Sequence, residues 1–82
     1  MTPNYEDVVR GLIAKVRRVP VDTVSLDSTL QDLGADSLEA LELLFELEDT
    51  FKISIPEEGF ERSKTVREMV ESLSVLISAA EA

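Results

Sequence analysis

The sequence predicts an all-α fold, a small antiparallel four-helix bundle with three longer helices, one short third helix and a long loop between the first two. Three observations support this prediction. Apolar residues recur with helical spacing in three stretches, about residues 3–18, 37–51 and 65–78. Capping residues stand at the expected ends of these stretches. The 82 residues suffice for one domain with a modest core, which favours a fold of local contacts, so we treat residues 1–82 as a single domain.

The first stretch has one apolar face and clear end signals. Thr2 and Pro3 are typical of an N-cap followed by the first helical residue, and Pro20 prevents the helix from continuing much beyond Arg18. Arg17 and Arg18 match the helix dipole at the C-terminal end. The apolar face is expected to comprise Tyr5, Val8, Val9, Leu12, Ile13 and Val16.

Residues 19–36 are expected to form a long but ordered loop. Apolar residues are spaced among Asp and Ser, and they indicate a loop anchored to a core: Val21, Val24, Leu26, Leu30 and Leu33. Residues 27–29 are expected to start a single helical turn, and Gly34 provides a position where the backbone can adopt a positive φ.

The second helix is expected over residues 37–51, with Asp36 and Glu39 forming a capping box. One sector of its helical wheel is a core face, made of Ala40, Leu43, Leu44, Leu47 and Phe51. A second apolar stripe with an acidic rim lies elsewhere on the wheel. A small bundle has no second core for this stripe, so we predict a partner-docking surface of Leu38, Glu39, Leu41, Glu42, Phe45, Glu48 and Asp49. The alternative is that Leu38 and Phe45 pack against the long loop or the short third helix.

The rest of the chain is expected to hold the short third helix at about 57–62 and a fourth helix at about 65–78. Thr65 and Glu68 form a second capping box, and the residues after 78 are expected to fray.

Composition excludes several function classes. The chain has no His and no Cys, so we expect no catalytic residue, no metal site and no enzymatic activity of its own. The net charge is −9, and residues 19–61 carry twelve acidic groups against one lysine, a net of −11. This charge excludes nucleic acid as a partner and favours proteins with basic patches. No stretch is long and apolar enough for stable membrane insertion, so we expect a cytoplasmic protein. We also expect it to be a monomer.

The stretch that joins the loop to the second helix resembles the signature of acyl carrier proteins, of the stand-alone bacterial type II. It reads Leu-Gly-Ala-Asp-Ser-Leu-Glu-Ala-Leu-Glu-Leu over residues 33–43. Phe51, Ile55-Pro56 and Thr65-Val66 extend the resemblance over essentially the whole chain.

The resemblance implies a 4′-phosphopantetheine arm on Ser37, transferred from coenzyme A by a magnesium-dependent phosphopantetheinyl transferase, with Asp36 supporting the transfer. Acyl cargo then rides as a thioester on the thiol of the arm, which explains how a chain without cysteine performs thiol chemistry. The implied partners are the transferase and acyl-transfer or synthase enzymes with basic docking patches. Core residues such as Leu47 are expected to line a cavity for the acyl chain.

Some residues differ from those usual in carriers for fatty acid synthesis. Phe45 stands on the partner face, Phe60 and Ser63 alter the short third helix, and Lys52 and Lys64 interrupt the acidity. We therefore expect acyl intermediates of fatty acid, polyketide or specialised lipid biosynthesis, and these differences favour a specialised carrier for a polyketide, an unusual lipid or an aminoacyl group. The competing hypothesis is an unmodified acidic helical module that binds other proteins through the surface of the second helix.

Overall fold

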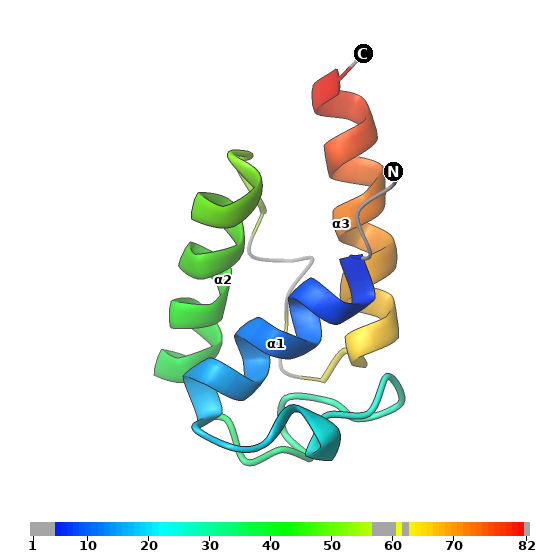
Figure 1. Cartoon of the computed structure of the whole chain (residues 1–82). Helices are drawn as coiled ribbons and strands as arrows, with labels where there is room; N and C mark the ends of the chain where they lie inside the picture. The colour runs from blue at the N-terminus through cyan, green and yellow to red at the C-terminus, as the bar shows by residue number, and fades with distance from the viewer. Residues whose placement is uncertain (1–4, 57–60, 62, 82) are drawn as a thin grey trace.

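A computed structural model describes residues 5–56, 61 and 63–81. Within these residues the chain forms three α-helices, α1 (Tyr5–Arg17), α2 (Ser37–Phe51) and α3 (Val66–Glu81), and a short 3-10 helix, η1 (Val21–Thr23) (Figure 1). The described part contains no β-strand, only an isolated bridge between Thr29 and Thr65. The all-α class is therefore confirmed. The short helix predicted at 57–62 falls largely on residues 57–60 and 62, which lie outside the described residues.

The described helices are not all antiparallel, and the predicted four-helix bundle is not confirmed, because the short third helix lies largely outside the described residues. In Figure 1, α2 and α3 both run from the bottom of the view to the top, whereas α1 crosses them in the opposite sense and contacts both. The reason is the length of the connection between residues 51 and 66. A helix of this length spans roughly 22 Å, and a chain of about fourteen residues is long enough to return along it.

The end of α1 is a tight reversal. The helix ends at Arg17, and Arg18 adopts a left-handed conformation with a φ of 58°. The N–H of Val19 donates to the carbonyl of Ala14 and that of Arg18 to the carbonyl of Lys15, which together form a Schellman motif. The predicted start at Thr2 and Pro3 lies outside the described residues.

The connection between α1 and α2 is anchored by apolar side chains and by an arginine. Val24 and Leu30 are buried in the core as predicted, whereas Val21 is 42% exposed, which contradicts its predicted role as an anchor. Val21 opens η1, and its carbonyl instead accepts a hydrogen bond from Arg10 Nη2 at 3.2 Å, while Arg10 Nε donates to the carbonyl of Val24 at 2.8 Å. The helical turn expected here begins at Thr29, whose carbonyl accepts from the N–H of Leu33.

The same loop covers the first turn of α3. The N–H of Val66 donates to the carbonyl of Ser28, and the N–H of Arg67 donates to the carbonyl of Leu26, each at 2.9 Å. The predicted capping box is present, because Thr65 and Glu68 exchange hydrogen bonds at 2.9 and 3.1 Å. The helix extends to Glu81, beyond the predicted end at about 78, because no glycine or proline interrupts the terminal stretch.

The three α-helices and the loop enclose a single hydrophobic core. The ring of Tyr5 at the start of α1 meets the ring of Phe51 at the end of α2 edge to face, with centroids 5.6 Å apart. This contact joins the two helices at the end of the molecule opposite the loop. The buried residues are Val9, Ile13, Ala14, Val24, Leu30, Ala35, Leu43, Leu44, Leu47, Ile55, Val66, Met69, Leu73 and Ile77.

Candidate functional site

The serine singled out by the sequence occupies the first position of α2. Ser37 is exposed, and Asp36 is the N-cap of the helix. Asp36 Oδ1 accepts a hydrogen bond from the N–H of Glu39 at 2.8 Å, and Glu39 Oε1 accepts from the N–H of Asp36 at 3.4 Å. The predicted capping box is therefore confirmed. It fixes the first turn of α2 without using the Ser37 side chain.

The backbone donors of this first turn remain open. Across the described part of the chain, the N–H groups of Ser37 and Leu38 have no acceptor, and the Ser37 hydroxyl has no hydrogen-bond partner. A helix N-terminus with free N–H groups carries a partial positive charge and favours an anion nearby. Ser37 thus combines an accessible hydroxyl with a backbone that tolerates a phosphate.

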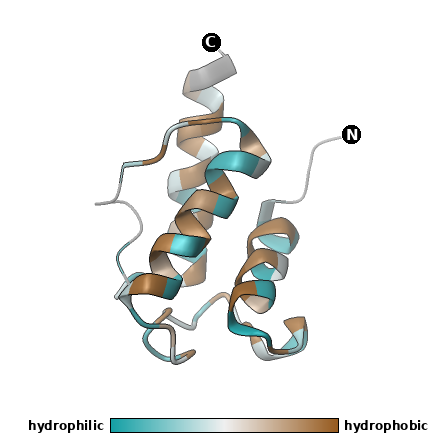
Figure 2. Cartoon of the chain, turned by 90° about the vertical axis from the view of Figure 1, so that its left-hand side faces the viewer, coloured by the Kyte–Doolittle hydropathy of each residue, from teal (hydrophilic) through white to brown (hydrophobic). Residues whose placement is uncertain are grey.

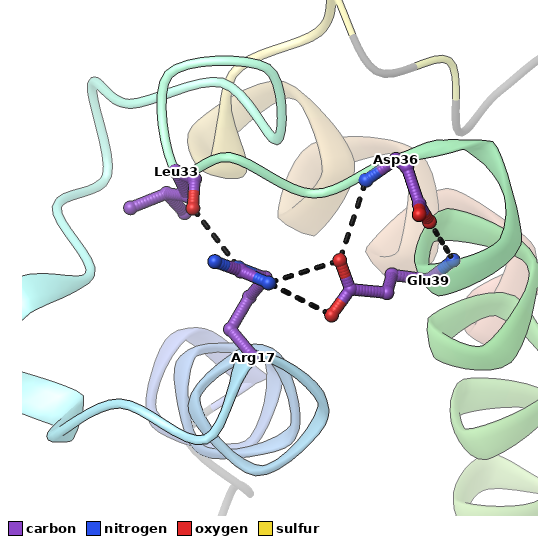
Figure 3. Close-up of polar contacts among 4 residues, drawn as sticks. All are labelled: Arg17, Leu33, Asp36 and Glu39. Atoms are coloured by element: carbon purple, nitrogen blue, oxygen red, sulfur yellow. Dashed lines mark hydrogen bonds and ion pairs between the residues drawn. The ribbon is translucent and has the colours of Figure 1, made fainter.

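Arg17 binds Glu39 in this turn and the backbone carbonyl of Leu33 in the loop, and the sequence does not predict either contact (Figure 3). Arg17 Nη1 lies 2.9 and 2.8 Å from the two carboxylate oxygens of Glu39, and Arg17 Nε donates to the carbonyl of Leu33 at 3.0 Å. The sequence indicates a role for Arg17 only at the dipole of α1. Its sequence signal is weak, because its two partners lie 16 and 22 positions away.

The predicted docking residues divide into two groups in the structure. Leu38 and Phe45 are 64% and 58% exposed, so neither is covered by the described part of the loop. Glu42 and Asp49 are also exposed. Figure 2 turns α2 toward the viewer and shows hydrophobic and hydrophilic segments alternating along it.

The other three predicted docking residues have partners inside the molecule. Leu41 is half-buried and packs against the core. Glu39 is held by Arg17, and Glu48 Oε2 accepts a hydrogen bond from the N–H of Ile55 at 2.9 Å. Glu48 therefore ties the chain after α2 back onto the helix, and only part of its surface faces solvent.

An open groove lies beside Phe45, between the end of α1 and the middle of α2. Its volume is about 380 Å³, and it is lined by Lys15, Val16, Arg18, Glu42, Phe45 and Glu46. Lys15 and Glu46 form an ion pair across it at 3.4 Å. The α1 residues of this groove were not among the predicted docking residues, because the sequence does not show which helix lies beside Phe45.

The described residues offer neither a metal centre nor a membrane span. They contain no group of three or more Asp or Glu side chains arranged to hold a metal ion. None of the described helices combines the length and the apolar character needed to cross a bilayer.

Comparison with known proteins assigns the chain to a family. Residues 7–73 match the family described as "Phosphopantetheine attachment site". The chain is 41% identical over 63 residues to an acyl carrier protein of Onion yellows phytoplasma (strain OY-M), which covers 76% of this chain and 83% of the relative. It is 40% identical over 75 residues to an acyl carrier protein of Streptomyces coelicolor, which covers 89% and 82%.

A much longer relative matches as well. A non-reducing polyketide synthase of Preussia isomera is 38% identical over 71 residues, which cover 87% of this chain and 3% of that synthase. The match to this large protein is thus confined to one short segment, whereas the matches to the two carriers extend over most of their length. The chain therefore belongs to the acyl carrier protein family, whose prosthetic group is a covalently attached 4′-phosphopantetheine.

Proposed function

We propose that Ser37 carries the 4′-phosphopantetheine arm and that the chain presents acyl intermediates of fatty acid or polyketide type as thioesters to synthase and acyl-transfer enzymes. Proteins of this family are carriers rather than catalysts. The observation that carries the proposal is the exposed Ser37 at the open N-terminus of α2.

The residues around Ser37 fit the prosthetic group. The N–H groups of Ser37 and Leu38, which have no acceptor among the described residues, suit a phosphodiester on the Ser37 oxygen. The arm supplies the thiol that this sequence without cysteine lacks. During transfer, the Ser37 oxygen forms a bond to phosphorus, loses its proton to a base and displaces the nucleotide part of coenzyme A. Asp36, next to this oxygen in the chain, is placed to help present it to the transferase and its magnesium ion.

The docking surface proposed for the partner enzymes is the exposed set Leu38, Glu42, Phe45 and Asp49. Its two apolar side chains provide contact area, and its carboxylates attract basic side chains on the enzyme. The groove beside Phe45 gives a side chain of the partner room to pack against Phe45 and Val16, next to the charged residues of the lining. A cytoplasmic location and a monomeric state stay predictions.

The attachment site is tested by intact mass. Apo protein is incubated with coenzyme A, magnesium and a broad-specificity phosphopantetheinyl transferase. We expect a gain of one phosphopantetheine unit in the wild type and none in Ser37→Ala. The control is Ser54→Ala, which removes another exposed serine and should leave the gain intact. If the wild type gains no mass under conditions that modify a known carrier, the chain is instead an unmodified interaction module.

The docking surface is tested by kinetics with the same transferase. Phe45→Ala should raise KM for the carrier by about threefold to tenfold with little change in kcat, since truncating a contact anchor weakens binding. Val75→Ala is the matched control, because Val75 is 69% exposed but lies on α3, outside the proposed surface. Equal KM values for Phe45→Ala and the wild type would remove Phe45 from the surface.

A further inference from the structure

Arg17 joins three segments that meet immediately before Ser37. It extends from the last residue of α1, donates to the loop carbonyl of Leu33 at 3.0 Å and holds the Glu39 carboxylate at 2.8 Å (Figure 3). Glu39 in turn accepts from the N–H of Asp36. The backbone from Leu33 to Asp36, and with it the start of α2, is therefore fastened to α1 through one guanidinium group.

This ion pair differs from the other ion pairs of the described residues in shielding and in distance. The side chains of Arg17 and Glu39 are 27% and 24% exposed, whereas those of Lys52 and Asp49 are 80% and 83% exposed and lie 3.4 Å apart. A partly shielded, charge-assisted contact is stronger and more geometrically defined than a solvated one.

The backbone is shaped to let the guanidinium approach. Gly34 has a φ of 81°, and a Cβ added there would lie 3.3 Å from Arg17 Nη2. Any other residue at position 34 would therefore crowd Arg17 as well as strain the turn. The conformation of the turn and the position of the Arg17 side chain therefore depend on each other.

The contact also controls charge beside the attachment position. Glu39 belongs to the same first helical turn as Ser37, where the transferred phosphate has to arrive. An unpaired carboxylate there would repel that phosphate and would oppose the favourable field of the helix N-terminus. The Arg17 guanidinium offsets this charge.

We propose that Arg17 is a positioning residue for the modification of Ser37: it holds the turn that precedes α2 and neutralises Glu39 next to the incoming phosphate. This inference rests on the proposed function. It assigns a role to a residue of α1 that does not itself touch the reacting atoms.

The test compares the apo wild type with Arg17→Gln, Arg17→Lys, the double variant Arg17→Gln/Glu39→Gln and the control Arg67→Gln. Arg67 forms an exposed ion pair with Asp27 at 3.1 Å, far from Ser37 in the sequence and on another helix. The transferase kcat and KM are measured with coenzyme A and magnesium at a temperature where circular dichroism shows every variant to be folded.

We expect Arg17→Gln to lower kcat by about tenfold and to leave KM within about twofold, because the docking surface is intact while the reacting oxygen is less well placed. The double variant should regain about threefold of the lost kcat, since it removes the Glu39 carboxylate that Arg17→Gln leaves without its cation. Arg17→Lys keeps the charge but cannot reach Glu39 and Leu33 together, so its kcat should lie between those of Arg17→Gln and the wild type. Arg67→Gln should match the wild type.

Three outcomes overturn the inference while the wild type is still modified: a kcat of Arg17→Gln equal to that of the wild type, an equal loss in Arg67→Gln, or a double variant no better than Arg17→Gln. If Arg17→Gln does not fold, Arg17→Lys takes its place, and a wild-type kcat for that variant overturns the inference. Failure of the wild type to accept the arm is a different result, because it refutes the proposed function and the inference falls with it.

Discussion

The N-termini of α2 and α3 are built alike and exposed differently. Each helix begins with a capping box, Asp36 with Glu39 in α2 and Thr65 with Glu68 in α3. In α3 the next two N–H groups donate to carbonyls of the loop, whereas in α2 the corresponding groups have no acceptor in the described part of the chain. The first helical residue of α3, Val66, is fully buried, whereas the first helical residue of α2, Ser37, is exposed.

A capping box does not determine whether the other backbone donors of a helix N-terminus find acceptors. The box satisfies the cap and the third helical residue of either helix, and it leaves two donors per helix for other partners. Tertiary structure then determines their use. The loop carbonyls accept hydrogen bonds from the donors of α3, whereas the donors of α2 have no acceptor in the described part of the chain. The same local sequence signal therefore precedes a covered helix end in α3 and, in α2, an open one at which we propose that the prosthetic group is attached.

The largest expected difference in the free energy of unfolding is between substitutions at the first residue of each helix, Val66 in α3 and Ser37 in α2. Val66→Ala should lower the free energy of unfolding by about 2 kcal/mol, because it removes fully buried methyl groups and leaves a cavity. Ser37→Ala should change it by less than about 0.5 kcal/mol, because the exposed hydroxyl has no partner in the described structure. Urea titration of both variants measures the difference. Equal destabilisation would show that the two helix ends are not distinguished by burial.

Local signals explain which parts of this site the sequence could predict. The capping box of α2 is predicted from residues three positions apart and is confirmed. The second apolar stripe is predicted from residues three to seven positions apart, and its members Leu38 and Phe45 are exposed. Leu41 lies in the same sector of the wheel yet packs against the core, because a wheel does not show how far the neighbouring elements wrap around a helix.

Contacts between distant segments were not predictable in this way. The hydrogen bonds from Val66 and Arg67 to the loop join backbone groups about forty residues apart, and a backbone carbonyl has no residue-specific signature. The parallel course of α2 and α3 likewise depends on the path of their connection rather than on a pattern within either helix. The sequence likewise indicates only the position of Arg17 at the end of α1, because its partner Glu39 lies 22 positions away and has a local role in the capping box of α2.

A second prediction concerns Gly34, which lies in the turn before the N-terminus of α2. Gly34→Ala should lower the free energy of unfolding by about 1–2 kcal/mol, because the φ of 81° is unfavourable for alanine and the new Cβ crowds Arg17. Gly11→Ala is the control. Gly11 lies within α1 with nothing within 4 Å of an added Cβ, so this change should stabilise the protein by about 0.5–1 kcal/mol. Destabilisation by both changes to a similar degree would contradict the structural reason given for Gly34.

The smallest expected effect concerns the capping box of α3, the helix whose N-terminus the loop covers. The backbone N–H of Thr65 and then its hydroxyl hold the pKa of Glu68 below the ordinary value of 4.5. Desolvation opposes them with a smaller effect, and the charge of Lys64 adds the smallest lowering effect. A carboxyl group whose pKa is lower in the folded state stabilises the fold above its unfolded pKa, and this contribution is lost as the pH falls through its folded pKa. The cap of α3 should therefore weaken only below pH 4.5.

NMR titration of the Glu68 side chain measures this directly. Thr65→Val should raise its pKa part of the way, because the hydroxyl is lost while the larger contribution, the backbone N–H, remains. Lys64→Gln should raise it less. A Glu68 pKa at or above 4.5 in the wild type, or one unmoved by Thr65→Val, would contradict the assignment. The loop carbonyls of Ser28 and Leu26 do not titrate, so the N–H groups of Val66 and Arg67 should keep their partners after Glu68 is protonated. In acid, the covering of α3 by the loop should therefore outlast its capping box. In α2 the corresponding N–H groups have no such acceptor in the described part of the chain, and Arg17 instead holds the Glu39 side chain of the capping box.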